Sequence, residues 1–239
     1  MKKTLIATSI ASAVSLSALT LPSVAAAEVS ANVGVVSNYF FRGVTQTDDS
    51  AAVQGGLDYA HESGFYAGTW ASNVDFGADA ANYELDLYAG YGGSVGDLSY
   101  DVGYVYYAYP DSPDDIDFGE IYGSLTYSYL TAGLAYTANG QADAGPFIQG
   151  DLYYYAGVDV PFGDSGFSGS LYYGYYTFDD DGEPGYGDMD YGHWTASVAK
   201  DAGDFGSFNM SFEMADVGED NFVSTNDDLQ VWVGWSKSF

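Results

Sequence analysis

Cysteine and positive charge are what this sequence lacks. Its 239 residues hold no cysteine, so disulfides do not support the fold. Only 5 lysines and arginines stand against 34 aspartates and glutamates, which gives a formal net charge of −29. Nucleic acids bind basic surfaces, so the composition excludes a nucleic-acid partner. After residue 27, the basic residues are Arg42, Lys200 and Lys237.

Long apolar runs are also missing once the N-terminus is passed. Residues 5–24 form the one stretch near the roughly 20 residues that a membrane helix needs. Two lysines precede this stretch, and an alanine run ending at Ala27 offers a cleavage site before Glu28. That pattern predicts a cleaved secretory signal peptide at 1–27 and an exported domain at 28–239. A transmembrane anchor is the weaker alternative, because serines and threonines interrupt the run.

Aromatic residues and glycine are abundant instead. The chain holds 24 tyrosines, 14 phenylalanines and 31 glycines. Disordered acidic chains are poor in aromatics, so this content argues against disorder. Aromatics suit strands and membrane-interface girdles, and glycines suit turns, bulges and aromatic packing.

Apolar residues alternate with a period of two along most of the chain, and no helical period of useful length appears. The alternation predicts about 12 strands. They lie near 29–42, 52–60, 65–73, 82–91, 98–108, 118–128, 130–137, 147–159, 167–178, 190–199, 206–215 and 228–239.

The links between these strands alternate between short and long, and the long ones carry most of the acidic residues. Outer-membrane barrels have short periplasmic turns and long outer loops. We therefore predict an all-β fold, a transmembrane antiparallel β-barrel of about 12 strands. A soluble sandwich or barrel is the alternative, but it does not predict the alternating link lengths.

The two faces of the predicted strands differ in chemistry. In the strand at 82–91, for example, Leu85 and Leu87 alternate with Glu84 and Asp86. A carboxylate facing lipid is costly, so the acidic face should line the lumen. In the strand at 147–159 the same rule places Ile148 on the lipid face. The predicted pore-lining residues are Arg42, Asp58, Glu84, Asp86, Asp101, Asp151 and Glu213.

Arg42 is the only arginine in the sequence. On the predicted strand 29–42 it shares a face with Asn32 and Asn38, which favours the lumen and an acidic neighbour. Asp58, Glu84 and Asp86 are the candidate partners. Arg42 would then pin the register through a buried ion pair or line a constriction, and an interface position at the strand end is the alternative.

Tyrosines add bulk to the predicted interior. They include Tyr107, Tyr153, Tyr155, Tyr172 and Tyr176. They could fill the lumen, narrow it, or form a stacking path for sugars or nucleosides. Twelve strands lie between small plugged barrels and wide porins, so we expect a narrow pore rather than a plug.

Motifs for catalysis or metal binding are missing. The acidic links at 111–117 and 179–183 lack the spacing of known calcium loops, so solvated loops are expected there. There is no nucleophile elbow, and the two histidines, His61 and His193, stand in no catalytic pattern. A phospholipase built from His193 and a nearby serine is a remote alternative. We predict no catalytic, metal or cofactor site and no enzyme activity.

The C-terminal strand has one apolar face and ends at Phe239. Its apolar face holds Leu229, Val231, Val233 and Trp235. A strand that runs to a terminal aromatic residue is typical of outer-membrane barrels. It predicts recognition by the barrel-assembly machinery of a Gram-negative outer membrane.

Three stretches carry a family resemblance. They read Ser-Asn-Tyr-Phe-Phe-Arg-Gly-Val-Thr-Gln-Thr at 37–47, Ala-Val-Gln-Gly-Gly-Leu-Asp-Tyr at 52–59 and Gly-Phe-Tyr-Ala-Gly-Thr-Trp-Ala-Ser-Asn-Val at 64–74. From about 29 to 74 the chain resembles the TorF family of outer-membrane porins, which are conserved hypothetical proteins of proteobacteria. Ala51 stands where many relatives have proline. The resemblance implies an outer-membrane barrel and a pore, without a substrate or catalytic residues.

These observations together predict passive diffusion of small solutes, with cations or neutral polar molecules favoured. The lumen carboxylates far outnumber the lumen base, and like charges along a narrow wet path bias the traffic of ions. The expected partners are outer-membrane lipid, lipopolysaccharide and small polar or cationic solutes, with no cofactor. The alternative is a structural or surface-interaction barrel that its own side chains plug.

Overall fold

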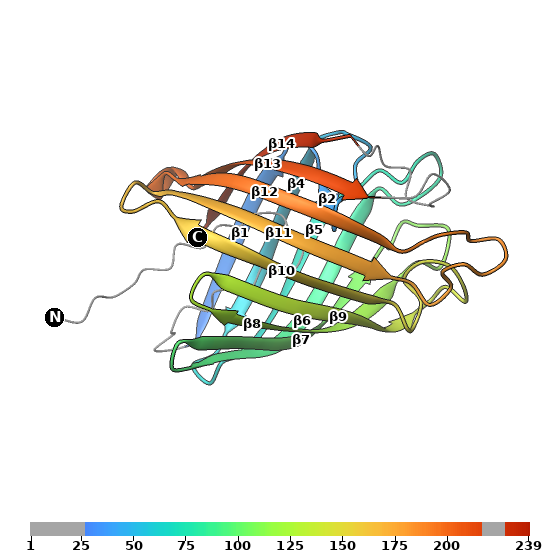
Figure 1. Ribbon diagram of the computed structural model, residues 1–239, viewed down its shortest axis with the longest axis horizontal. Helices are drawn as coiled ribbons and strands as arrows, with labels where there is room; N and C mark the ends of the chain where they lie inside the picture. Colours follow the sequence, from blue (N-terminus) through green and yellow to red (C-terminus); the bar gives the residue numbers. More distant parts are fainter. Residues whose placement is uncertain (1–26, 217–227) are drawn as a thin grey trace.

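The computed structural model describes residues 27–216 and 228–239. In these ranges the chain forms a closed antiparallel barrel of 12 strands, shown in Figure 1. The barrel strands are β1 (Glu28–Val36), β4 (Ala52–Ala60), β5 (Phe65–Asn73), β6 (Tyr83–Val95), β7 (Leu98–Ala108), β8 (Phe118–Tyr127), β9 (Leu130–Gly140), β10 (Leu152–Pro161), β11 (Phe167–Thr177), β12 (Tyr191–Asp201), β13 (Ser207–Asp216) and β14 (Gln230–Ser238). Each strand pairs with its sequence neighbour, and β1 closes the barrel against β14. The predicted fold is confirmed, while most of the predicted signal peptide, residues 1–26, lies outside the described residues.

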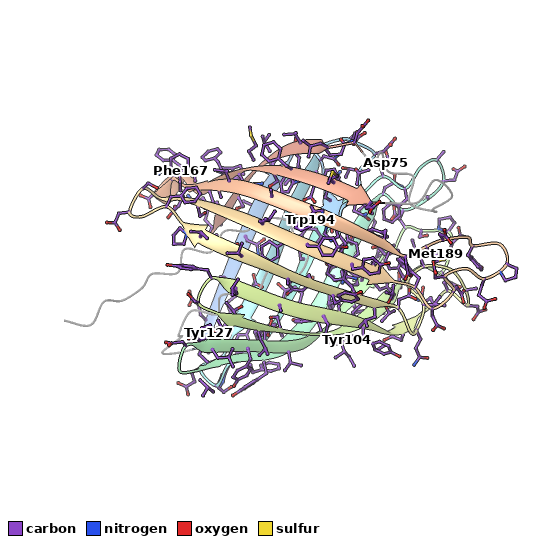
Figure 2. The ribbon with its side chains drawn as sticks, in the orientation of Figure 1. Asp75, Tyr104, Tyr127, Phe167, Met189 and Trp194 are labelled. Atoms are coloured by element: carbon purple, nitrogen blue, oxygen red, sulfur yellow. The ribbon has the colours of Figure 1, made fainter. Side chains whose placement is uncertain are left out.

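The outer wall of the barrel is apolar. Leu87, Val102, Ile121 and Leu134 point outward and are between 49% and 53% exposed. Aromatic side chains join them, and Figure 2 shows Tyr104, Tyr127, Phe167 and Trp194 directed away from the barrel. A wall of this composition needs lipid around it, and closure leaves no unpaired strand edge in that lipid.

The links sort by length to the two ends of the barrel. Short links join β4 to β5, β6 to β7, β8 to β9, β10 to β11 and β12 to β13, and the C-terminus lies at that end (Figure 1). The longer links, such as 109–117 and 178–190, gather at the other end, as the sequence predicted. We call these the short-turn end and the long-link end.

One predicted strand is shorter than expected. The strand predicted at 29–42 ends at Val36, and the chain then forms a small hairpin from β2 (Phe40–Phe41) and β3 (Val44–Thr45). Arg42 and Gly43 form its tip with φ values of 51° and 84°, a turn that no continuous strand can contain. Arg42 therefore does not share a strand face with Asn32, and that prediction is wrong.

The strand predicted at 147–159 is also shorter, because β10 begins at Leu152. Residues 147–151 belong to the preceding link, where Phe147 and Gly150 have φ values of 65° and 123°. Ile148 consequently lies buried within this link rather than on the lipid face. The period-two rule fails here because it holds only for extended backbone.

Tyrosines on the inner wall lie over glycines of neighbouring strands. A Cβ atom added to Gly133 of β9 would come within 2.6 Å of the Tyr155 ring of β10. One added to Gly157 would come within 2.2 Å of the Tyr172 ring of β11. These glycines serve aromatic packing, as the sequence predicted.

The described residues contain one short 3-10 helix, η1 (Gly203–Phe205), in the link before β13. No helix within the described ranges has the length and apolar character needed to cross a membrane.

A charge on the outer wall should destabilise the barrel far more than the same charge on the inner wall. Val102→Arg places a cation on the lipid face of β7 and should lower the free energy of unfolding by about 2–4 kcal/mol. Ser99→Arg, on the inner face of the same strand near the short-turn end, should change it by less than about 0.5 kcal/mol. Urea titration in lipid vesicles, followed by tryptophan fluorescence, measures both. Equal losses would contradict a lipid-covered wall.

Candidate functional site in the barrel lumen

A hairpin from the first long link folds into the lumen. We call residues 38–47 the inward hairpin. Tyr39, Phe40, Phe41 and Arg42 are all buried, with Arg42 only 2% exposed. The base of the hairpin is closed by the Gln46 backbone N–H, which donates to the Tyr39 carbonyl at 2.7 Å, and the Thr47 hydroxyl donates to Asn38 Oδ1 at 3.1 Å.

Arg42 at the tip of the inward hairpin reaches across to β8. Its Nη1 and Nη2 atoms donate to Glu120 Oε1 and Oε2 at 2.7 Å and 2.6 Å, and both side chains are fully buried. The strand alternation predicts a lumen position with an acidic neighbour and offers Asp58, Glu84 or Asp86 as that partner. The actual partner is different because the hairpin carries Arg42 off the wall and across the interior.

Glu120 was missed among the pore-lining residues, although its position was readable. It is two residues after Phe118 and two before Tyr122, and the three share the inner face of β8. The outward Ile121 lies between them, 49% exposed. The same alternation rule that selected Glu84 and Asp86 would have selected Glu120.

Aromatic rings enclose the guanidinium. Arg42 Cζ lies 4.2 Å from the ring centroid of Tyr153, 4.8 Å from that of Tyr176 and 4.6 Å from that of Phe41. Tyr176 also donates its hydroxyl hydrogen bond to Glu120 Oε1 at 3.3 Å, and Tyr107 donates to Glu120 Oε2 at 3.3 Å. The cation is thus held by two hydrogen bonds to a carboxylate and by contact with three aromatic rings.

The inward hairpin contacts other parts of the wall as well. Tyr39 donates to Glu84 Oε1 at 3.2 Å and packs edge-on against Trp70 of β5, with ring centroids 5.6 Å apart. Asp86, next on the same face of β6, is buried, and its Oδ1 accepts no hydrogen bond from the described residues. Glu84 and Asp86 therefore lie on the inner wall, where the sequence placed them.

Further buried polar side chains of the interior lie on β12, β13 and β14. Glu213 accepts from Thr195 Oγ1 at 2.7 Å and from Trp232 Nε1 at 3.4 Å, and it is 2% exposed. His193 Nε2 shares a hydrogen bond with the Tyr153 hydroxyl at 2.9 Å. Gly43 of the inward hairpin touches this histidine, because an added Cβ would come within 2.6 Å of the His193 Cβ.

A second segment, the link 141–151, also folds inward. Phe147 stacks on Phe118 with centroids 4.6 Å apart and lies 6.4 Å from Phe41 of the inward hairpin. Asp151, predicted to line the pore from a strand, instead fastens this link. Its Oδ2 accepts from the Ile148 backbone at 3.1 Å, and its Oδ1 accepts from the Asp179 backbone at 2.9 Å.

Burial raises the pKa of Asp151 to about 6, although the backbone hydrogen bonds act to lower it. The nearby Asp179 carboxylate adds to the increase. The folded link therefore keeps the carboxyl group neutral up to a higher pH than it would be in an exposed aspartate.

The half of the lumen at the short-turn end is more open. Asp58, Asp101 and Asp159 are half-buried there, and each accepts a hydrogen bond from an inner-wall tyrosine. The donors are Tyr88 to Asp58, Tyr66 to Asp101 and Tyr172 to Asp159. We call these three aspartates and their tyrosines the acidic chamber, and Asp58 and Asp101 were among the predicted lumen residues.

Charge in the interior is strongly unbalanced. Within residues 27–216 and 228–239 the buried carboxylates are Glu84, Asp86, Glu120, Asp151 and Glu213, while Arg42 is the one buried arginine or lysine. Carboxyl groups therefore outnumber basic side chains in the described part of the interior.

The two histidines lie in different surroundings. His61 lies in an exposed short turn, where its Nδ1 is 2.9 Å from Ser63 Oγ. His193 is bonded to Tyr153 rather than to a serine. In the described ranges, no three His, Cys, Asp or Glu side chains are grouped so that they could hold a metal ion.

Comparison with known proteins gives a family match and a set of structural likenesses. The family model Gcw_chp, a bacterial protein of unknown function, matches residues 22–239. No curated protein matches the sequence. The TorF resemblance stays a prediction, since none of these findings carries that name.

The solved structures that resemble the chain include outer-membrane porins. The KdgM porin matches with a TM-score of 0.56 at 6% identity, over 88% of this chain and 98% of the porin. A structure from work on in-meso crystallization of membrane proteins gives 0.53 at 10% identity, over 88% and 83%. OprD from Pseudomonas aeruginosa gives 0.45 at 15% identity, over 80% and 60%. At these identities the likeness extends to the fold alone.

Breaking the Arg42–Glu120 pair should destabilise the barrel strongly. Arg42→Met and Glu120→Gln should each lower the free energy of unfolding by about 3–5 kcal/mol, because either leaves a buried group without its partner. The double variant should lose less than the sum of the two. Urea titration of the four proteins measures the coupling, and additive losses would contradict it. Lys200→Met is the control, since an exposed cation should contribute at most about 1 kcal/mol.

The link 141–151 should be held more tightly in acid. A raised carboxyl pKa stabilises the folded link fully below the ordinary value of 3.8, and this stabilisation is lost as the pH rises through about 6. Amide hydrogen exchange in residues 141–150, corrected for intrinsic rates, should thus be slower at pH 5 than at pH 7. Asp151→Asn should abolish the difference. If the exchange rates of Asp151→Asn still differ between pH 5 and pH 7, a titratable group other than Asp151 causes the difference.

Proposed function

This chain belongs to the Gcw_chp family of bacterial proteins of unknown function, and from that premise we propose that it is an outer-membrane channel for small solutes that favours cations. The observation that carries the proposal is the charge of the interior. Five buried carboxylates and one buried arginine line or fill a lumen that continues into the acidic chamber. An excess of negative charge in such a path attracts cations and repels anions.

Several features support the outer membrane of a Gram-negative bacterium as the location. The apolar wall and the alternating link lengths both fit a barrel of that membrane. Its expected partners there are lipid, lipopolysaccharide, small polar or cationic solutes and, during assembly, the barrel-assembly machinery. The resemblance of residues 29–74 to the TorF porins agrees with this proposal.

The proposed channel is closed in the arrangement described here. Glu120, Trp232 and Glu213 come from strands around the lumen, and each is at most 2% exposed. The inward hairpin fills the space between them and bonds to the wall through Arg42 and Tyr39. Passage of a solute therefore requires the inward hairpin to move, and we propose that it acts as the gate.

The alternative is a structural or surface-interaction barrel that is permanently plugged. The full burial of both Arg42 and Glu120 favours it, because such a pair is costly to separate. The two functions differ in one respect, which is whether the inward hairpin opens on the timescale of transport.

Conductance across a planar bilayer separates the two functions. We expect rare openings in the unmodified protein and frequent openings in Arg42→Ala, because this variant lacks the ion pair that holds the inward hairpin to Glu120. Under a salt gradient the reversal potential should have the sign of a cation-selective pore. A correctly folded Arg42→Ala barrel that stays silent would contradict the channel and support the plug.

Selectivity can be assigned to the acidic chamber by a matched pair of variants. In the Arg42→Ala background, Asp58→Asn with Asp101→Asn should move the reversal potential toward zero, because it removes two lumen charges. The control is Asp115→Asn in an exposed long link, which should leave the reversal potential nearly unchanged. Equal shifts would assign the selectivity to the outer surface.

A further inference from the structure

We propose that the recess holding Arg42 is a binding site for a guanidinium-bearing organic cation, and that Arg42 is its tethered occupant. Guanidinium-bearing cations would then be a solute class of the proposed channel. Their transport, unlike their binding, rests on the proposed function. The binding itself can be measured without any transport.

The recess belongs to the barrel wall rather than to the inward hairpin. Glu120 comes from β8, Tyr107 from β7, Tyr153 from β10 and Tyr176 from β11. Of the groups that contact the guanidinium, Phe41 is the one contributed by the hairpin. If the hairpin moves away, the carboxylate and the wall tyrosines stay in place on paired strands.

Interactions within the wall fix the shape of this recess. Tyr153 is held by its hydrogen bond to His193 and stacks on Tyr155, with ring centroids 5.8 Å apart. Tyr176 stacks on Phe178 at 4.3 Å and bonds to Glu120. Because the wall already orders these side chains, a free ligand would find them in position, which lowers the cost of binding.

The chemistry of the recess selects a planar cation. Both oxygens of Glu120 accept from the two terminal nitrogens of a guanidinium, a geometry that neither an ammonium group nor an alkali ion can match. The rings of Tyr153 and Tyr176 lie within 4.8 Å of the central carbon and attract a delocalised cation. A guanidinium group on a small organic solute satisfies all of these contacts.

The tethered occupant does not use the site fully. Arg42 Nε is buried, yet it donates to no acceptor among the described residues. The Arg42 backbone also adopts φ of 51°, a left-handed conformation that is unfavourable for residues other than glycine. A free ligand is not tied to this backbone conformation, and it can therefore compete with Arg42 for the recess.

The test uses the full barrel in detergent micelles with ethylguanidinium as the probe. Arg42→Ala empties the recess, and we expect saturable binding by calorimetry together with a higher unfolding temperature. Arg42→Ala with Glu120→Gln should bind about ten- to a hundredfold more weakly, because the bidentate acceptor has lost its charge. Ethylammonium should bind more weakly than ethylguanidinium, and sodium at equal ionic strength should have no effect.

Lys200→Ala provides the matched control. Lys200 Nζ lies 4.9 Å from the Phe167 ring, so this variant also uncovers an aromatic ring, but on the exposed surface and without a carboxylate contact. It should gain no binding. Equal binding by Lys200→Ala and Arg42→Ala, or by Arg42→Ala with and without Glu120→Gln, would overturn the proposal. A folded Arg42→Ala barrel that binds nothing would overturn it as well.

If Arg42→Ala does not fold, the proposal is tested on the unmodified protein. Ethylguanidinium should displace Arg42 and speed amide hydrogen exchange in residues 38–47, and an unchanged rate would overturn the proposal. Failure of the channel is distinguishable from failure of the site. A silent bilayer with intact binding would refute transport alone, whereas cation conductance without binding would refute the site alone.

Discussion

Two parallel hydrogen bonds between Arg42 and Glu120 hold the inward hairpin against the opposite wall of the barrel. The hairpin has only two residues in each strand, so its own ladder cannot keep it in place. Its position depends on side chains, above all on this pair. The pair in turn depends on burial, because a guanidinium and a carboxylate taken out of water need each other. The surrounding tyrosines complete the arrangement by bonding to Glu120 and covering the cation.

The lumen consequently has two unlike halves. At the long-link end two inward segments meet, and the contact between Phe147 and Phe41 joins them into one packed interior. At the short-turn end, aspartates such as Asp58 and Asp101 remain half-buried and bonded to tyrosines. One half resembles the core of a soluble protein, and the other resembles a polar channel. The proposed gate, the inward hairpin, lies between the packed half and the open half of the lumen. Carboxyl groups outnumber basic side chains on both sides of it.

Sequence reasoning captured the barrel but not the contents of its lumen. Strand alternation depends on neighbouring residues, so it could select Glu84, Asp86 and Glu213, which are buried in the structure, and could also have selected Glu120. The inward hairpin depends on contacts between Arg42 and a residue 78 positions away, and no local pattern reports such a distance. Asp151 and Ile148 were misplaced for a related reason, since the alternation was extended across backbone that is no longer a strand.

The glycines of the inner wall have a consequence for the bore of the barrel. Tyr155 and Tyr172 rest on Gly133 and Gly157, so their rings lie along the wall instead of standing upright in the interior. The width available to a solute is then governed by the smallest residues of the wall as much as by the largest. Exchanging a single glycine for alanine would tip a ring inward and tighten the passage with no change in strand number. Evolution can in this way adjust calibre by small steps while the architecture stays constant.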